Sequence, residues 1–543
     1  SGLPAAAQRP YYVGDASVYL FGKNGEAPND SILYKNLNIH YYDKLQVRPN
    51  MLYRWMNYQQ FVRSKQMRAS NRTRLYSQYR QEQVQEKLSQ LGIFSYLDMQ
   101  YAPRDTTAAC DTLDVTMQAT FAKPLDAELE LNVVTKSNDQ TGPGASFGVT
   151  RNNVFGGGES WNVKLKGSYE WQTGGGEKSS LMNSWEMGLS TSLTFPRVVF
   201  PHLGKREFDF PATTTFRLYI NQLNRAKYYK LLSFGGNATY DFQPSRTSRH
   251  SITPFKLTFN VLQHQSAEFK EIAEANPALY VSLRNQFIPA MEYTYTYDNA
   301  SVRRIKNPIW WQSTVTSAGN ITSLIYRAFG KPFNEKDKSL LGAPFAQFVK
   351  LNTELRHLWN LDKNNAIASR VAVGALFTYG NATVAPYSEQ FYVGGANSIR
   401  AFTVRSVGPG GYHPAEGKYS YLDQTGTFRF EANVEYRFRI FKSFWGATFL
   451  DAGNVWLLRK DRELLADGKE ARPDSQLRLK TFPKQIALGT GVGIRYDMDI
   501  LVFRLDFGIP LHLPYDTDRS GYYNVTGAFF KNLGIHFAIG YPF

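Results

Sequence analysis

Most of this chain alternates between apolar and polar residues, and that pattern limits its fold more than any other feature. In the stretch 160–172 every second residue is apolar or glycine: Trp161, Val163, Leu165, Gly167, Tyr169 and Trp171. The residues between them are polar or charged, and the same pattern fills 427–440. A repeat of two places one face of an extended strand in apolar surroundings and the other in water. The sequence therefore predicts a protein built mainly of half-buried β-strands.

The apolar faces of these strands need either a second sheet or lipid to cover them. No segment approaches the roughly 18 consecutive apolar residues of a membrane-spanning helix, which excludes a helical membrane protein. The composition is 15% aromatic and only 20% charged, with 42 glycines. Such a composition is typical of a transmembrane β-barrel, whose strands are polar at every second residue. We therefore expect a barrel in a bacterial outer membrane, with its charged strand faces lining a wet lumen.

We predict 16 antiparallel strands within a barrel that covers residues 127–543. They lie at 127–136, 144–154, 160–172, 180–193, 213–222, 229–242, 251–264, 287–297, 308–318, 348–359, 366–379, 427–440, 446–457, 485–496, 501–510 and 532–543. An even number is expected for a single-chain bacterial barrel. With the N-terminal part in the periplasm, the long connections 266–285, 320–346, 391–414, 458–484 and 511–530 lie outside the cell. The first of them has an amphipathic helical pattern broken at Pro277.

The N-terminal part of the chain follows a different pattern. After a tail at 1–10, we expect a strand at 11–21, helices at 51–64 and 71–91, and strands at 95–101 and 113–121. Apolar residues recur at near-helical spacing in the second helix, and Gly92 is a suitable stop. The order β-α-α-β-β predicts one small α+β domain over 11–123.

This order of elements, with Leu-Gly-Ile-Phe at 91–94 joining helix to strand, resembles a POTRA domain. POTRA domains precede the barrel in the outer-membrane assembly family that includes BamA, TamA and TamL-like proteins. The resemblance covers nearly the whole chain. It implies a periplasmic POTRA-like domain followed by a barrel in the outer membrane of a Gram-negative bacterium.

The most specific part of the resemblance lies in the glycine-rich stretch 391–414. The residues that carry it are Gly394, Gly395, Ser398, Ile399, Arg400 and Phe402, which are similar to a Val-Arg-Gly-Phe/Tyr motif with Ala401 in place of the usual glycine. The resemblance implies a loop that folds into the lumen, where Arg400 meets Glu435 and Asp451. The alternation agrees, because Asp451 shares a strand face with Phe449 and a carboxylate that faced lipid would be costly.

The C-terminal strand carries a second pattern, Asn532, Gly534, Phe537, Ile539 and a terminal Phe543. It resembles the C-terminal signal of bacterial outer-membrane barrels. Gly540 lies where relatives have a kink in the last strand, although a glycine could equally accommodate barrel curvature. In the family the first and last strands pair poorly, which here implies a weak seam between 127–136 and 532–543. An exposed strand edge can template the strand of another protein.

The remaining chemistry of the sequence is sparse. The formal charge of +16 is spread over the chain, which favours contact with anionic lipid headgroups or lipopolysaccharide over nucleic-acid binding. Cys110 is the only cysteine, so an internal disulfide is excluded. The Gly-x-Ser-x-Gly stretch at 144–148 lacks the helix that a hydrolase needs after its serine. We expect no catalytic residue, no metal site and no cofactor.

The resemblance implies a non-enzymatic factor that inserts or translocates polypeptides of the BamA/TamA type. Its expected partners are unfolded outer-membrane protein clients, outer-membrane lipids and, through the POTRA-like domain, periplasmic proteins or lipoproteins. Two alternatives stay open: a two-partner secretion exporter and a passive porin-like channel. The former normally has a second POTRA domain and a plug helix, and the latter has neither a POTRA domain nor the arginine-bearing loop.

Overall fold

The computed structural model describes most of the 543 residues. The described residues are 9–35, 37–56, 75–107, 110–136, 140–172, 184–199, 212–225, 229–267, 270, 285–300, 305–336, 338–340, 342–382, 384–414, 423–460, 470, 472–498, 501–527 and 532–543. The backbone divides into two compact units, 1–129 with 147–164 and 191–216, and the remainder of the chain. Among the described residues no helix has the length and apolar character needed to cross a membrane.

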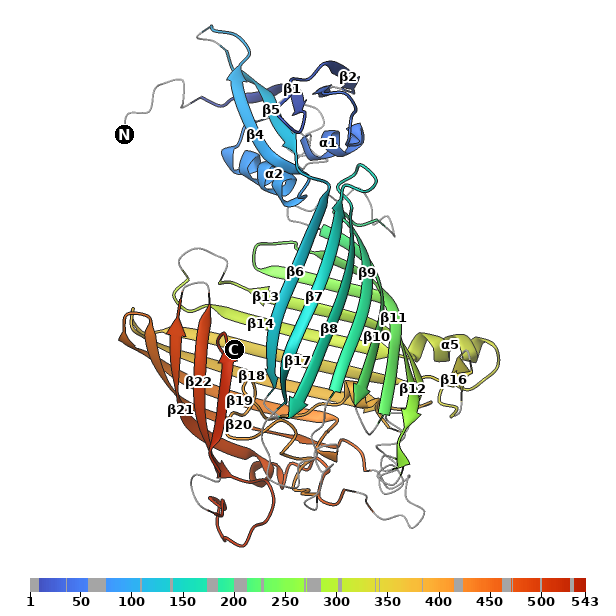
Figure 1. The fold of residues 1–543 in the computed structure, drawn as a ribbon, viewed down its shortest axis with the longest axis vertical. Coiled ribbons are helices and arrows are strands. Elements are labelled where there is room, and N and C mark those ends of the chain that lie inside the picture. Colours follow the sequence, from blue (N-terminus) through green and yellow to red (C-terminus); the bar gives the residue numbers. More distant parts are fainter. Residues whose placement is uncertain are drawn as a thin grey trace. The chain divides into compact units, whose positions relative to one another are not determined.

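The N-terminal part of the first unit is a five-stranded sheet with two helices (Figure 1). The elements are β1 (Tyr12–Phe21), β2 (Asp30–Tyr34), β3 (Leu37–Tyr41), α1 (Pro49–Met56), α2 (Gln78–Gln90), β4 (Phe94–Pro103) and β5 (Thr112–Phe121). The sheet order is β2-β3-β1-β5-β4, with β1 parallel to both β3 and β5. The central strand therefore lies between segments that are far apart in the sequence.

Two strands of this sheet were absent from the sequence prediction. The order is β-β-β-α-α-β-β, because β2 and β3 form a short antiparallel hairpin before α1. The hairpin is only five residues a side, and β2 is exposed along most of its length, so its alternation is weak. The second helix also starts later than predicted: Leu75 is in a bridge with Tyr12, and α2 begins at Gln78. Residues 57–74 lie outside the described part of the chain, and they include the end of the first predicted helix and the start of the second.

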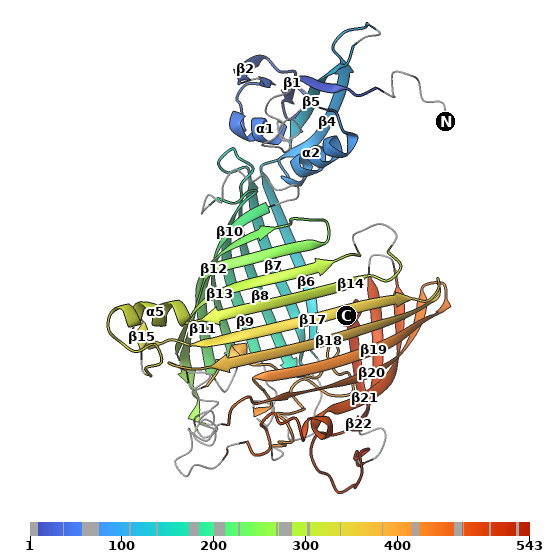
Figure 2. The same cartoon turned by 180° about the vertical axis from the view of Figure 1, so that it is seen from behind.

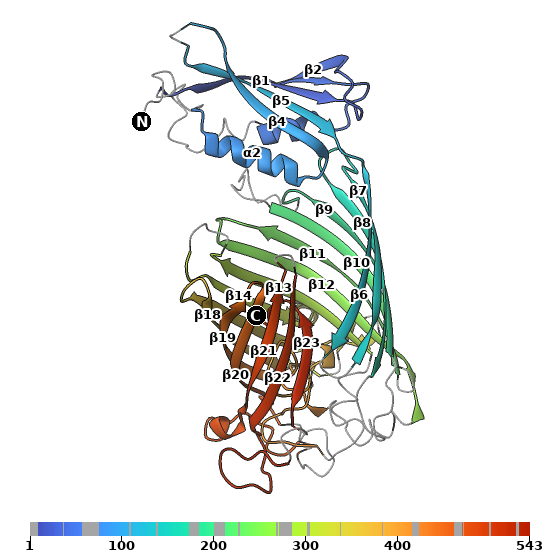
Figure 3. The same cartoon turned by 60° about the vertical axis from the view of Figure 1, so that its left-hand side comes forward.

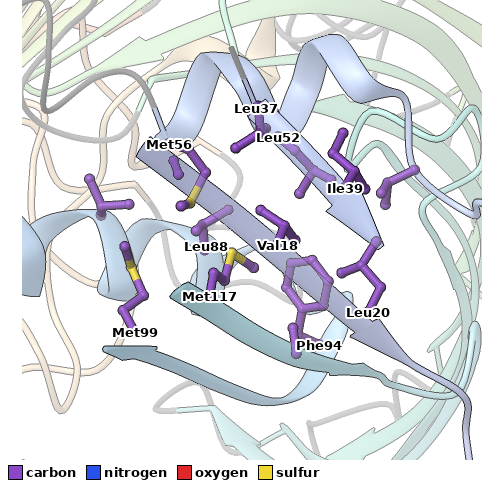
Figure 4. Close-up of a cluster of buried hydrophobic side chains, with 14 of the residues drawn as sticks. Val18, Leu20, Leu37, Ile39, Leu52, Met56, Leu88, Phe94, Met99 and Met117 are labelled. Atoms are coloured by element: carbon purple, nitrogen blue, oxygen red, sulfur yellow. The ribbon is translucent and has the colours of Figure 1, made fainter. Parts of the chain in front are cut away.

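A buried hydrophobic cluster fills the space between this sheet and the helices (Figure 4). The alternation of β1 supplies Val18 and Leu20, and the helices supply Leu52 and Leu88, all of them essentially inaccessible to water. Burying one such side chain contributes about 1.5–3 kcal/mol. The domain thus has its own core, as the amphipathic pattern of its elements requires.

The other long strands form one 16-stranded antiparallel sheet. In sequence order they are β6 (Leu125–Lys136), β7 (Gln140–Asn152), β8 (Ser160–Gln172), β9 (Ser184–Phe195), β10 (Ala212–Arg225), β11 (Tyr229–Phe242), β12 (Ser248–Gln265), β13 (Gln286–Asp298), β14 (Ile309–Ala318), β17 (Phe348–Asn360), β18 (Asn365–Thr378), β19 (Phe428–Phe441), β20 (Phe444–Trp456), β21 (Ala487–Asp497), β22 (Val502–His512) and β23 (Gly534–Ile539). Each pairs with its neighbour in the chain, so that β13, β14, β17 and β18 lie side by side (Figure 2). All 16 predicted strands are present.

The sheet order runs from β23 at one end to β6 at the other. The pairings of the described residues therefore do not include closure between the first and last strands, and the closed barrel stays a prediction. The last strand is also shorter than predicted (Figure 3). It ends at Ile539 because Gly540 has φ +86°, a left-handed conformation that interrupts an extended strand.

The connection between β14 and β17 contains structure that the sequence analysis treated as loop. Helix α5 (Asn320–Ala328) follows β14, and β15 (Ser339–Leu340) and β16 (Ala343–Pro344) form a small hairpin after it. The helix predicted within 266–285 falls almost wholly on residues outside the described set.

Candidate functional site

Residues 391–414, which we call the Arg400 loop, are part of the connection between β18 and β19. The loop folds over the face of the sheet that carries Glu435 and Asp451, which we call the charged face. Gly394 has φ +101°, and its N–H bonds to Ser398 Oγ at 3.0 Å. Gly395 N–H bonds to the Phe402 carbonyl at 2.7 Å. These bonds close a tight turn that presents Arg400. Glycine suits the turn because other residues rarely adopt this backbone conformation.

The strand register brings the two carboxylates to the same place. Asn433 on β19 is opposite Asp451 on β20, and Glu435 is opposite Phe449. Residues two apart on a strand share a face, so Glu435 and Asp451 are diagonal neighbours on the charged face. Both side chains are completely buried.

Arg400 contacts both carboxylates, as the resemblance implied. Its Nε and Nη2 donate to the two oxygens of Asp451 at 2.8 and 2.9 Å, and its main-chain N–H donates to Asp451 Oδ2 at 3.0 Å. Nη1 donates to Glu435. The guanidinium also stacks on the Phe449 ring, with Cζ 3.6 Å from the centroid. A planar guanidinium that forks onto a carboxylate and rests on an aromatic face is a geometry that lysine cannot reproduce.

Further buried charges extend this cluster beyond the predicted residues. Glu435 also pairs with Arg437 at 2.7 Å and with Arg495 at 3.1 Å. Arg495 Nη1 lies 2.7 Å from Asp506, and Arg504 lies 3.3 Å from the same carboxylate. Four arginines and three carboxylates thus interlock across β19–β22 and the loop. Buried charges are tolerated when they are paired in this way, and removing one partner leaves an uncompensated charge.

The other residues of the loop motif also contact the protein around the charged face. Ser398 Oγ donates to Glu431 at 2.7 Å, and its carbonyl accepts from Asn433 Nδ2 at 2.9 Å. Ile399 and Phe402 are buried in an apolar cluster that includes Val393 and Val455. Ser398 therefore bonds to the sheet, and Ile399 and Phe402 are buried against apolar side chains.

Glycines of β21 and β22 form the floor beneath the loop apex. A side chain at Gly489 would collide with the Ala401 methyl, and one at Gly508 would collide with the Arg400 carbonyl. The loop backbone thus lies directly on the backbone of the sheet. The methyl group of Ala401, which stands where the family motif has glycine, is accommodated because Gly489 leaves room for it.

The last strand joins the same cluster through a residue that the sequence analysis missed. His536 on β23 is buried, and its Nε2 lies 2.8 Å from the Arg400 carbonyl oxygen. A carbonyl only accepts hydrogen bonds, so Nε2 carries the hydrogen. The signal was present in the alternation, since Ile535 and Phe537 on either side of His536 are exposed on the opposite face. The predicted loop site and the predicted seam are therefore connected.

The C-terminal residues reach this cluster as well. Arg437 Nη2 donates to the Phe543 main-chain oxygen at 3.3 Å, and Arg437 Cζ lies 4.3 Å from the centroid of the Tyr541 ring. Of the other seam residues, Asn532 Nδ2 donates to the Thr526 carbonyl at 2.9 Å, and Ile539 is exposed. A Cβ added at Gly534 would lie 3.2 Å from the Arg400 carbonyl oxygen. Gly534 thus belongs to the floor under the loop.

A family model described as the Omp85 superfamily domain matches residues 153–543, which is most of the chain. The chain belongs to the Omp85 superfamily. Members of this family are β-barrels of the outer membrane. In this Omp85 chain, the Arg400 loop and its partners on β19–β23 all fall within the matched residues.

Solved structures resemble this Omp85 protein at low sequence identity. BamA from Haemophilus ducreyi, lacking POTRA domains 1–3, matches with a TM-score of 0.55 and 12% identity, covering 94% of this chain and 88% of that one. CdiB from Acinetobacter baumannii matches with a TM-score of 0.45, 13% identity and coverage of 81% and 66%. CdiB from Escherichia coli matches with a TM-score of 0.42, 11% identity and coverage of 99% and 92%. At 12% identity the BamA match describes a shared fold.

Proposed function

We propose that this Omp85 protein inserts outer-membrane proteins, or translocates polypeptides, by a non-enzymatic mechanism of the BamA/TamA type. The observation that carries the proposal is the state of the last strand. β23 has six residues, and in the described part of the chain its ladder partner is Phe503–Gly508 of β22. It is the end strand of the sheet order, and its charged face contacts the Arg400 carbonyl of the loop through His536.

A short end strand can offer its unpaired backbone groups to another chain. Unpaired N–H and C=O groups at a sheet edge are a template for strand addition. An unfolded outer-membrane client would gain hydrogen bonds at that edge and bury its own apolar surface in lipid as it folds. In this mechanism the sheet closes through β6 and β23, and the contact between them opens to admit the client strand.

The Arg400 loop would hold the four strands next to β23, which are β19–β22, in a rigid arrangement. It binds β19 and β20 through carboxylates and rests on β21 and β22 through glycines. Strands β19–β22 would therefore keep their arrangement while the edge strand β23 pairs first with β6 and then with a client strand. We propose that the loop is a structural latch and takes no part in covalent chemistry.

The N-terminal α+β domain would lie in the periplasm as a POTRA-like module. There it would receive unfolded clients and bind periplasmic or lipoprotein partners. Its exposed end strand β2 is suited to pairing with an extended segment. Outer-membrane lipid and lipopolysaccharide would contact the apolar face of the long strands.

The test places a photo-crosslinking amino acid at Ile535, on the apolar face of β23, in the source bacterium. The matched control position is Leu355, which is similarly exposed on the apolar face of β17 in the middle of the sheet. We expect outer-membrane clients to crosslink at Ile535 and not at Leu355. Equal crosslinking at the two positions, or none at either, would contradict the seam mechanism.

Depletion of the protein, followed by a census of outer-membrane proteins, distinguishes a general assembly factor from a specialised one and from an exporter. A broad loss of barrels indicates a general assembly factor, and a narrow loss indicates a specialised one. Loss of a single secreted protein with intact barrels would indicate an exporter of the two-partner type instead.

A further inference from the structure

We infer that helix α5 is an interfacial helix whose apolar side inserts into the outer leaflet of the membrane. The residues that carry this inference share one side of the helix and have large exposed side chains. They are Ile321, Leu324, Ile325 and the C-cap residue Phe329, of which Phe329 is 84% exposed. Their spacing of three and four residues defines a single apolar stripe, which Ala328 continues.

The opposite side of α5 is bonded to the protein, so the apolar stripe cannot turn inward. The buried Ser323 hydroxyl accepts a hydrogen bond from Lys338 Nζ at 3.1 Å. Asn320 donates to Ser317 Oγ at 2.8 Å and accepts from Tyr379 Oη at 2.9 Å. Tyr326 Oη donates to the Ser339 carbonyl. These bonds fix the rotation of the helix about its own axis.

The apolar stripe continues the apolar face of the sheet. On β14 and β17 that face carries Trp311 opposite Leu355 and Val315 opposite Leu351, all exposed. Helix α5 begins two residues after β14 ends, and it projects beyond the ends of β14 and β17 (Figures 1 and 2). If the strand face is covered by lipid, the stripe lies at the level where that lipid meets water.

The charges around α5 suit this position. Arg327 and Lys331 are exposed at the end of the helix, and Lys331 lies 5.7 Å from the centre of the Tyr326 ring. Cations beside an apolar helical face pair with the phosphates of lipid headgroups, and such a helix sinks about 5–10 Å into the boundary between headgroups and acyl chains. The combination favours a lipid surface over a protein partner as the occupant.

The inference rests on the proposed membrane location of the sheet, so its test includes a separate report on the sheet. In a Cys110→Ser background, single substitutions Ile325→Cys, Phe329→Cys, Arg327→Cys and Leu355→Cys are spin-labelled. The proteins are reconstituted in phosphatidylethanolamine–phosphatidylglycerol vesicles. Power saturation then measures the accessibility of each label to oxygen, which concentrates in lipid, and to a water-soluble nickel chelate.

We expect the ratio of oxygen to nickel accessibility to be several-fold higher at positions 325 and 329 than at 327, and to approach the value at 355. A lipid-like 355 with a water-like 329 overturns the inference about α5 and leaves the membrane-spanning sheet standing. A water-like 355 overturns both. Exclusion of both reagents from 325 and 329 shows a protein covering the stripe, which also overturns the inference.

Discussion

The carbonyl oxygen of Arg400 lies 2.8 Å from Nε2 of His536, 136 residues further along the chain. The same arginine binds the carboxylates of β19 and β20 through its side chain and main-chain N–H. Arg400 thus joins β19 and β20 to the last strand of the sheet.

Replacing Arg400 with alanine should release the loop. Asp451 would lose its guanidinium, and breaking a buried pair by removing one partner typically costs about 3–5 kcal/mol. We expect a lower unfolding temperature and new protease cleavage within 391–414. Arg405→Ala is the matched control, because Arg405 lies in the same loop but rests on the Tyr387 and Tyr392 rings. Equal protease resistance in the two variants would refute the latch.

The pair formed by Arg400 and Asp451 should show strong energetic coupling. A double-mutant cycle with Arg400→Met and Asp451→Asn is expected to give an interaction free energy of about 2–3 kcal/mol, near the upper end for contacting residues. Denaturant unfolding of the four proteins in detergent measures it. Arg400→Met combined with Asp362→Asn, an exposed position in the β17–β18 turn, should be additive. A coupling of zero for the buried pair would mean that the loop is held by its apolar residues alone.

Replacing His536 with alanine should loosen β23 and leave the Arg400 contacts with β19 and β20 intact. We expect faster hydrogen exchange at the amides of Gly534–Ile539 and unchanged exchange in β18. His536→Gln keeps a side-chain N–H donor and should restore part of the protection. If the two variants show the same hydrogen exchange, the packing of the His536 side chain rather than its hydrogen bond holds the strand.

Filling the glycine floor should displace the loop. At Gly489 a side chain would meet Ala401, so Gly489→Val is expected to cost about 1–3 kcal/mol by overpacking. Gly167→Val on β8 is the control, since an added Cβ there has no heavy atom within 4 Å. Thermal unfolding and protease access to 391–414 are the readouts. A larger effect at Gly167 would contradict the close approach of loop and sheet.

The N-terminal domain should lose stability at acidic pH through one ion pair. The hydrogen bond from Arg104 Nη2 to Asp114, 2.6 Å long, lowers the pKa of that carboxyl. A lowered folded-state pKa stabilises the domain above the pKa of the unfolded chain, about 3.9, and this contribution disappears as the pH falls through the folded-state value. The protection of β1 and β5 from hydrogen exchange should therefore differ between the native protein and Arg104→Gln at neutral pH, and this difference should shrink as the pH falls below about 3.9. A difference that does not change as the pH falls would assign the effect to packing.

Properties that depend on near neighbours in the chain were predictable from the sequence. The alternation located all 16 long strands, and two of them, at 160–172 and 229–242, have the predicted bounds. It failed at β2, β3 and α5. The two strands are short and partly exposed, and α5 is a nine-residue helix inside a stretch interpreted as loop.

Within the candidate site the resemblance supplied Arg400, Glu435 and Asp451, and alternation indicated which way the acids face. Alternation also assigns Arg495, Asp506 and His536 to the polar face of their strands, but it does not distinguish them from the other polar residues of that face. Each becomes part of the site through the register of the paired strands.

The amino-acid pattern alone predicts that this protein is mainly β, where its long strands run, and which strand faces are polar. Those properties follow from a repeat of two, which the backbone geometry of a strand imposes residue by residue. Only the tertiary structure decided which buried charges meet and that Arg400 touches the last strand. Such contacts depend on the relative shift of strands and on the path of a loop, and both are set by the packing of the whole sheet.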